Sequence, residues 1–280
     1  MSVKTIKFLL IWILISFRLD TFAENKYEKM VQITSSHFII GCDKGDENVF
    51  CQRKESPSHR LNIKNFWIDI YEVTVFEYAL CIEKGACTLP DTISEDCSDH
   101  VGKQPNAEYN NWINKSVRKD HPINCVTWHQ AKTYCEWLGK RLPTEVEWEK
   151  AARGVDGRQY PWGNEPATCN HAIMTTDEEG GGCGLDSTWP VGSKIKGASP
   201  YGVLDMSGNI AEWTADWYDE NLYRTKIVDD LQGPITGKYR VVKGGRYSSP
   251  SSTIQTFSRS PYEPDRAFDS VGFRCALSEE

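Results

Sequence analysis

The chain has 280 residues, of which 39% are hydrophobic and 25% are charged, so it carries enough apolar mass for a packed core. The formal net charge of -7 argues against a partner such as nucleic acid or an anionic membrane, because no basic patch stands out. No linker rich in Pro, Gly or Ser and no internal repeat divides the sequence, which favours a single domain.

The first residues have the pattern of a targeting segment. Lys4 and Lys7 precede an apolar run at residues 8–17, and Ala23 offers a small-residue cleavage site. We therefore expect residues 1–23 to be a signal peptide and residues 24–280 to form the mature domain, secreted or periplasmic and without a membrane span after cleavage. An uncleaved anchor is the alternative.

The ten cysteines agree with an oxidising compartment. Their even number and spacing suggest five disulfides, although spacing alone does not determine connectivity. A zinc site, the alternative, would need closely paired thiolates such as C-x-x-C, and the sequence has none. Four of the pairs that we expect are Cys42–Cys51, Cys81–Cys87, Cys97–Cys125 and Cys169–Cys183.

The N-terminal third of the mature chain contains short strands and one helix. Apolar residues predict strands within residues 31–41, 56–61 and 66–71. Thr74 followed by Glu77 is a capping box that begins a helix, and Gly85 ends it. Residues 88–120 are polar and without period, which indicates a long surface loop.

Two further capping boxes lie in the middle of the chain, at Thr127 with Gln130 and at Thr144 with Glu147. Gly139 ends the first of these helices, and Pro143 prevents the two from joining. After Arg153 the periodicity disappears, and short strands with glycine-rich turns follow. The pattern predicts an α+β fold of low regular secondary structure that disulfides staple together.

Several long motifs resemble the formylglycine-generating enzyme (sulfatase-modifying factor) family. They include Gly-Asn-Ile-Ala-Glu-Trp at 208–213 and Gly-Phe-Arg-Cys-Ala at 272–276, and the others lie at residues 66–69, 71–74, 126–128, 135–153 and 160–164. The resemblance covers roughly residues 30–278. It implies the C-type-lectin-like fold in its formylglycine-generating variant, and a fifth disulfide, Cys135–Cys275.

The resemblance also implies a structural calcium ion. The family binds calcium through side-chain oxygens and main-chain carbonyls at the motif that here spans 205–212, and hard oxygen donors on a tight turn suit this ion. The positions that carry over are Asp205, Gly208, Ile210 and Glu212. Hydrogen bonding of Glu212 to loop amides without a metal is the alternative. At the family's second calcium site Cys183 takes the place of an expected Asp, so we expect the Cys169–Cys183 disulfide to replace that ion.

The family's catalytic copper ligands are missing from this chain. In formylglycine-generating enzymes a pair of cysteines binds Cu(I), which soft thiolates suit and hydroxyls do not. Ser249 and Ile254 occupy the two positions here, and Arg246 replaces a Ser. We therefore expect no copper and no copper-dependent oxidation of a Cys to formylglycine.

The sequence still predicts a binding groove, and the residues that we expect to line it are mostly polar. These candidates are Arg246, Tyr247, Ser248, Ser249 and Arg259, with Trp217 as a further possibility. The serines lack a G-x-S-x-G elbow and a histidine placed as a base, which favours a polar loop over a nucleophile. The two arginines suit a carboxylate or phosphate, but could instead pair with Glu263, Asp265 or Asp269.

The leading prediction is a peptide- or small-molecule-binding domain, associated with the envelope and its proteins. An oxidoreductase that acts on a non-sulfatase substrate in the same groove is the first alternative, and a sulfatase-activating oxidase is the second.

Overall fold

The computed structural model describes residues 27–43, 49–91, 97, 107–224 and 233–279. The expected signal peptide and part of the expected loop at 88–120 lie outside these residues. Within the described part of the chain, no helix has both the length and the apolarity to cross a membrane.

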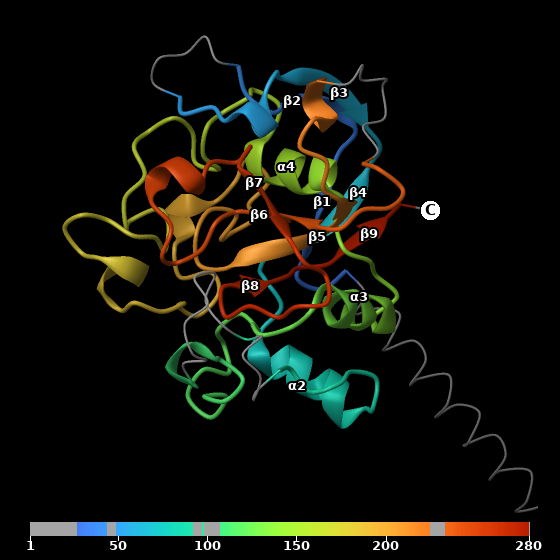
Figure 1. Cartoon of the computed structure of the whole chain (residues 1–280), viewed down its shortest axis with the longest axis vertical. Coiled ribbons are helices and arrows are strands. Elements are labelled where there is room, and N and C mark those ends of the chain that lie inside the picture. The colour runs from blue at the N-terminus through green and yellow to red at the C-terminus, as the bar shows by residue number, and fades with distance from the viewer. Residues whose placement is uncertain (1–26, 44–48, 92–96, 98–106, 225–232, 280) are drawn as a thin grey trace, which may run out of the picture.

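The strands form three small sheets in the described residues (Figure 1). One sheet has the order β1-β4-β9 and is antiparallel, and β2 pairs with β3 in an antiparallel hairpin. The third has the order β7-β6-β5-β8, with β8 parallel to β5. The bounds are β1 Met30–Ile33, β2 Ser36–Ile40, β3 His59–Ile63, β4 Phe66–Asp69, β5 Ala211–Trp217, β6 Arg240–Lys243, β7 Arg259–Tyr262, β8 Val271–Gly272 and β9 Ala276–Ser278.

The helices begin where the capping boxes predict. The α-helices are α2 Val75–Glu83, α3 Trp128–Trp137 and α4 Glu145–Arg153. In each, the Thr hydroxyl before the helix accepts a hydrogen bond from the third residue's N–H, and that residue's side chain accepts one from the Thr N–H. Short 3₁₀ turns are η1 Arg53–Glu55, η2 Ala107–Tyr109, η3 Gly181–Gly184, η4 Ile195–Gly197, η5 Leu222–Arg224 and η6 Ser251–Thr253.

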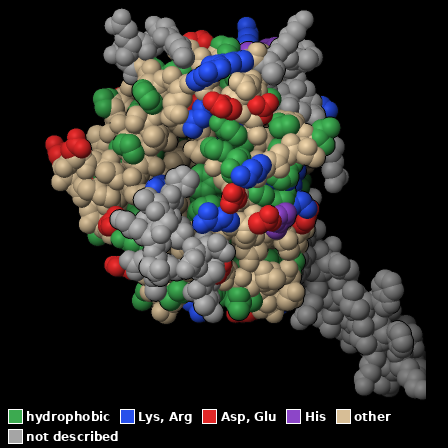
Figure 2. Space-filling view, viewed as in Figure 1, with side chains coloured by type: hydrophobic (Ala, Val, Ile, Leu, Met, Phe, Trp, Pro, Cys, Tyr) green, Lys and Arg blue, Asp and Glu red, His purple; other side chains and the backbone are tan. Residues whose placement is uncertain are grey.

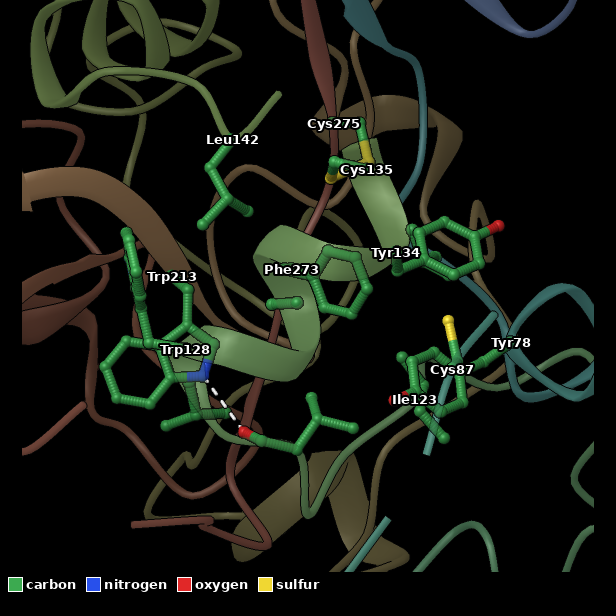
Figure 3. Packing of buried hydrophobic residues seen from close by; sticks show 14 of the residues in the cluster. Tyr78, Cys87, Ile123, Trp128, Tyr134, Cys135, Leu142, Trp213, Phe273 and Cys275 are labelled. Carbon is green, nitrogen blue, oxygen red and sulfur yellow. Dashed lines mark hydrogen bonds between the residues drawn. A yellow bond between two sulfur atoms is a disulfide. The ribbon is translucent and has the colours of Figure 1, made fainter. Parts of the chain in front are cut away.

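The main core lies where α2 and α3 meet the four-stranded sheet, and α4 covers that sheet from the other side (Figure 1). Phe273 packs at its centre, with its ring 5.4 Å from that of Tyr134 and 6.4 Å from that of Tyr78 (Figure 3). The Trp213 indole N–H donates to the Val126 carbonyl at 3.1 Å, so the buried indole keeps a hydrogen bond.

Five disulfides staple the fold, and they are the five expected pairs: Cys42–Cys51, Cys81–Cys87, Cys97–Cys125, Cys135–Cys275 and Cys169–Cys183. The pair implied by the resemblance joins α3 to the residue just before β9, across a sequence separation of 140 (Figure 3). The α+β, disulfide-stapled fold is therefore confirmed. On the face shown in Figure 2, acidic and basic side chains are intermixed.

Candidate functional site

The predicted groove lies beside the turn that follows β6. Gly244 and Gly245 turn the chain with φ values of 89° and 70°, which glycine adopts readily. A Cβ on Gly245 would lie 2.7 Å from the Ile254 side chain, so the turn packs directly against the next segment. Beyond it, the Arg246 N–H donates to the Ser249 hydroxyl at 3.1 Å, which fixes the loop.

The resulting cavity is about 250 Å³ and brings together three predicted residues, Arg246, Ser248 and Ser249. Its other hydroxyl-bearing residues are Thr253, Ser258, Ser260 and Tyr262. Ser258 is buried, and its hydroxyl has no hydrogen-bond partner among the described residues. A buried polar atom without a partner is costly, so a bound ligand that supplied one would be stabilised here.

The other predicted groove residues lie elsewhere. Tyr247 is buried and stacks on Tyr109, with ring centroids 6.3 Å apart, so it supports the groove from below. Burial raises the pKa of Tyr247. The guanidinium of Arg246 donates to the Ser270 hydroxyl at 3.0 Å, and Asp265, one of its alternative partners, contacts His129.

The expectation that Arg259 lines the groove is wrong. Its side chain is fully buried and donates to both carboxylate oxygens of Glu145, at 2.7 and 2.8 Å, so it anchors α4 and does not line the groove. Glu145 is the first residue of α4, and no sequence motif connects it to Arg259. Trp217 also lies outside the groove, in a separate cleft beside Arg240.

The lining of the groove limits its chemistry. Among the described residues, no histidine and no carboxylate lines the cavity. Lys243 does line it, but its ammonium group is buried and pairs with Glu149 at 2.9 Å. Among the described residues, the serine hydroxyls of the groove therefore have no general base beside them in the lining.

Ser249 and Ile254, which occupy the positions of the family's copper ligands, have different surroundings in the structure. Ser249 lines the groove, whereas Ile254 is fully buried in an apolar cluster with Tyr160, Ala172 and Met174. All ten cysteines form disulfides, so no free thiol stands near either position.

The turn at 205–212, where the resemblance implies calcium, is tightly wound. Asp205 and Asn209 both have positive φ, at 58° and 57°. Gly208 lies so close to Ile173 that a Cβ would stand 2.2 Å from its carbonyl oxygen. Only glycine fits this position, which presses the turn against the neighbouring chain.

Glu212, an expected calcium ligand, accepts hydrogen bonds from two buried side chains. Arg274 donates to both of its carboxylate oxygens at 2.7 Å, and the Trp148 indole donates to one of them at 2.9 Å. All three side chains are fully buried. A guanidinium thus already neutralises Glu212, and this carboxylate does not fit the role of a free calcium ligand.

A second pair of buried carboxylates lies beside this ion pair. Asp205 accepts a hydrogen bond from the Gly192 N–H at 2.5 Å, and one oxygen of Glu72 accepts from the Asn209 amide at 3.0 Å. The other oxygen of Glu72 is buried and has no partner that meets hydrogen-bond geometry in the described residues. Burial raises the pKa of both carboxyl groups, and the nearby charge of Asp205 raises that of Glu72 further.

The sequence did not indicate this cluster of buried acidic groups. Three buried carboxylates, those of Glu72, Asp205 and Glu212, face the single guanidinium of Arg274, so negative charge is in excess. The unsatisfied oxygen of Glu72 is the type of donor that calcium prefers. Glu72 lies far from the 205–212 motif in the sequence, and spacing alone could not find it.

The chain is similar in sequence and in structure to several known proteins. Residues 17–279 match the model of the sulfatase-modifying factor enzyme 1-like domain. A formylglycine-generating enzyme of Thermomonospora curvata is 38% identical over 288 residues, which cover 88% of this chain and 92% of that protein. The "Inactive C-alpha-formylglycine-generating enzyme 2" of Mus musculus is 27% identical over 315 residues, covering 96% and 92%. The structure of PvdO from Pseudomonas aeruginosa has a TM-score of 0.70 at 24% identity, covers 89% of this chain and 94% of its own, and shares the fold.

Proposed function

Because this chain belongs to the sulfatase-modifying factor enzyme 1-like family, we propose that it is a secreted or periplasmic binding domain. It holds a peptide or a small molecule in the groove beside Arg246, and envelope proteins are the partners that this location offers. It does not convert cysteine to formylglycine with copper. Its five disulfides fit an extracellular or luminal protein.

One observation carries this proposal: the groove has hydroxyl groups where the copper-dependent chemistry needs thiolates. Ser249 lines it, Ile254 is buried beneath it, and every cysteine is in a disulfide. Hydroxyls keep their protons near neutral pH and are hard donors, so they do not hold Cu(I). The unpartnered hydroxyl of Ser258 and the guanidinium of Arg246 instead supply donors for a polar ligand.

The relatives favour two readings of the same groove. The name of the mouse relative states that it is inactive, which supports a family member that binds without oxidising. The identity to the Thermomonospora curvata enzyme, whose name states that it generates formylglycine, supports an oxidoreductase as the second candidate, with a non-sulfatase substrate because the thiol pair is missing. Sulfatase activation, the third candidate, would need a thiol pair that this chain does not offer.

Metal analysis and an oxidation assay test the proposal. The purified protein is loaded with Cu(I), desalted and analysed for copper, and then incubated with oxygen and a cysteine-containing sulfatase peptide. The Thermomonospora curvata relative is the positive control. We expect neither stoichiometric copper nor an aldehyde in the peptide. One copper per chain together with formylglycine would overturn the proposal, and oxygen uptake on another substrate would favour the second candidate.

We also propose a structural calcium ion between Asp205 and Glu72, with the carbonyls of Gly208 and Ile210 as further ligands. Glu212 stays paired with Arg274 in this arrangement. The ion would neutralise the excess buried charge and cross-link the 205–212 turn to the segment after β4, and it takes part in no reaction. At the second family site, we propose that the Cys169–Cys183 disulfide takes the place of calcium.

A further inference from the structure

A second cleft is larger than the groove beside Arg246. It has a volume of about 1180 Å³ and lies between the β3–β4 turn, the start of α4, the second half of β5 and the residues around 233–235. Its lining includes Asn62, Asn65, Asp216, Trp217, Ile235 and Arg240. None of these residues lines the smaller groove.

Arg240 has an unusual environment in this cleft. Its guanidinium lies between two indole rings, 3.7 Å from the centroid of Trp128 and 3.5 Å from that of Trp217. It donates one hydrogen bond, to the Ala215 carbonyl at 2.6 Å. Its Nε is buried without a partner, and no carboxylate of the described residues forms an ion pair with it. A guanidinium with five donors is thus held rigidly in place with most of them unused.

The other charged groups of the cleft define which anion fits. Arg141, the other arginine of the lining, is already neutralised by Glu147, whose two oxygens each accept a hydrogen bond at 2.6 Å. Lys64, Asp216 and Glu279 also line the cleft. Asp216 accepts from the Glu145 N–H at 2.5 Å, and its charge acts on Arg240 from beside it. The carboxylates would repel a polyanion that spanned the cleft, whereas one carboxylate on Arg240 adds a single, local charge.

The rest of the lining suits an extended chain. The amides of Asn62 and Asn65 can exchange hydrogen bonds with peptide groups, and Ile63, Pro234 and Ile235 offer apolar contacts. Ile235 is 94% exposed, so an apolar side chain at the rim is left uncovered. The volume exceeds the roughly 300–1,000 Å³ that drug-sized ligands fill, which favours a longer ligand over a small metabolite.

We propose that this cleft binds an extended acidic peptide, with Arg240 anchoring one carboxylate of the peptide between the two tryptophans. The site is separate from the groove beside Arg246 and does not depend on what that groove binds. The peptide's neighbouring apolar side chains contact Ile235 and Ile63, and its amides face the two asparagines.

Isothermal titration of the full protein with two capped heptapeptides tests this proposal. One has a central Glu flanked by Val and Ala, and the other has Gln in place of Glu. We expect the Glu peptide to bind about tenfold or more tightly, because hydrogen bonds to a charged group are worth about that factor. Equal affinity of the two peptides for the wild-type protein would overturn the assignment of Arg240.

Variants of Arg240 and of a control residue distinguish a direct contact between Arg240 and the peptide carboxylate from a general attraction between charges. Arg240→Met keeps a long apolar stem between the rings and should lose the preference for Glu, whereas Arg240→Lys should keep part of it. Lys238→Met removes the same charge from an exposed neighbour that does not line the cleft, and should bind as the wild type does. Thermal melting checks that each variant folds. If Arg240→Met does not fold, the affinities of the two peptides for the wild-type protein and for Arg240→Lys still test whether Arg240 binds the carboxylate. Glutarate that bound as tightly as the peptide would overturn the peptide assignment.

Discussion

Replacing Arg274 by Met should destabilise this protein strongly. Arg274 is fully buried and forms a bidentate ion pair with Glu212. It also donates to three main-chain carbonyls, those of Asp69 at 3.1 Å, Ile70 at 3.0 Å and Leu204 at 2.9 Å. The variant removes all of these donors at once and leaves the Glu212 carboxylate buried beside two other carboxyl groups.

The expected loss follows from the uncompensated charge. Breaking a buried ion pair by removing one partner costs about 3–5 kcal/mol of the free energy of unfolding. For a domain of this size, 1 kcal/mol corresponds to a shift of about 2–4 °C in melting temperature. We therefore expect the melting temperature to fall by roughly 6–20 °C, with the protein still folded at room temperature.

A double-mutant cycle measured by calorimetry at pH 7, with the disulfides intact, tests this reasoning. The cycle compares Arg274→Met, Glu212→Gln and the double variant with the wild type. The double variant should lose less stability than the sum of the single variants, by at least about 1 kcal/mol, because it does not leave Glu212 charged and unpaired. If the single losses add to the double loss within about 0.5 kcal/mol, the ion pair does not have the role assigned to it.

Two further predictions concern buried charges. Calcium should raise the melting temperature of the wild-type protein, because an ion that binds only the folded state stabilises it by mass action. Glu72→Gln should reduce this rise, whereas the exposed control Glu83→Gln should keep it. A rise in Glu72→Gln identical to that of the wild type would show that Glu72 is not a ligand. Lys150 is buried and donates to the Thr34 and Ser36 carbonyls, and burial lowers its pKa to about 8. The unfolded chain therefore binds more protons between pH 8 and about 10.4, and this group makes stability rise with pH across that window. Denaturant titrations of Lys150→Met across the same window should show a flatter profile, and an unchanged slope would contradict the shift.

Local features of this protein could be predicted from its sequence. The caps at Thr74, Thr127 and Thr144 act on neighbours three residues away, so spacing alone reveals them. The even number of cysteines and the long motifs together led to the five disulfide pairs. Arg246, Ser248 and Ser249 meet in one cavity because they are consecutive or nearly so on a single tight turn.

The buried ion pairs could not be predicted in this way. Arg259 finds Glu145 across 114 positions, and Arg274 finds Glu212 across 62. Such contacts depend on how the sheets and α4 pack, and neither spacing nor periodicity encodes them. The same limit explains why the sequence places Arg259 at the groove and does not indicate the ion pair of Glu212, the contacts of Glu72 or the cleft at Arg240.

The position of Phe273, Arg274 and Cys275 has a consequence for folding. These three consecutive residues fill the centre of the main core, neutralise the buried Glu212 and close a disulfide loop of 140 residues. The main core, the buried ion pair and the long covalent loop therefore all wait for one short segment to dock, which makes its docking a single cooperative step.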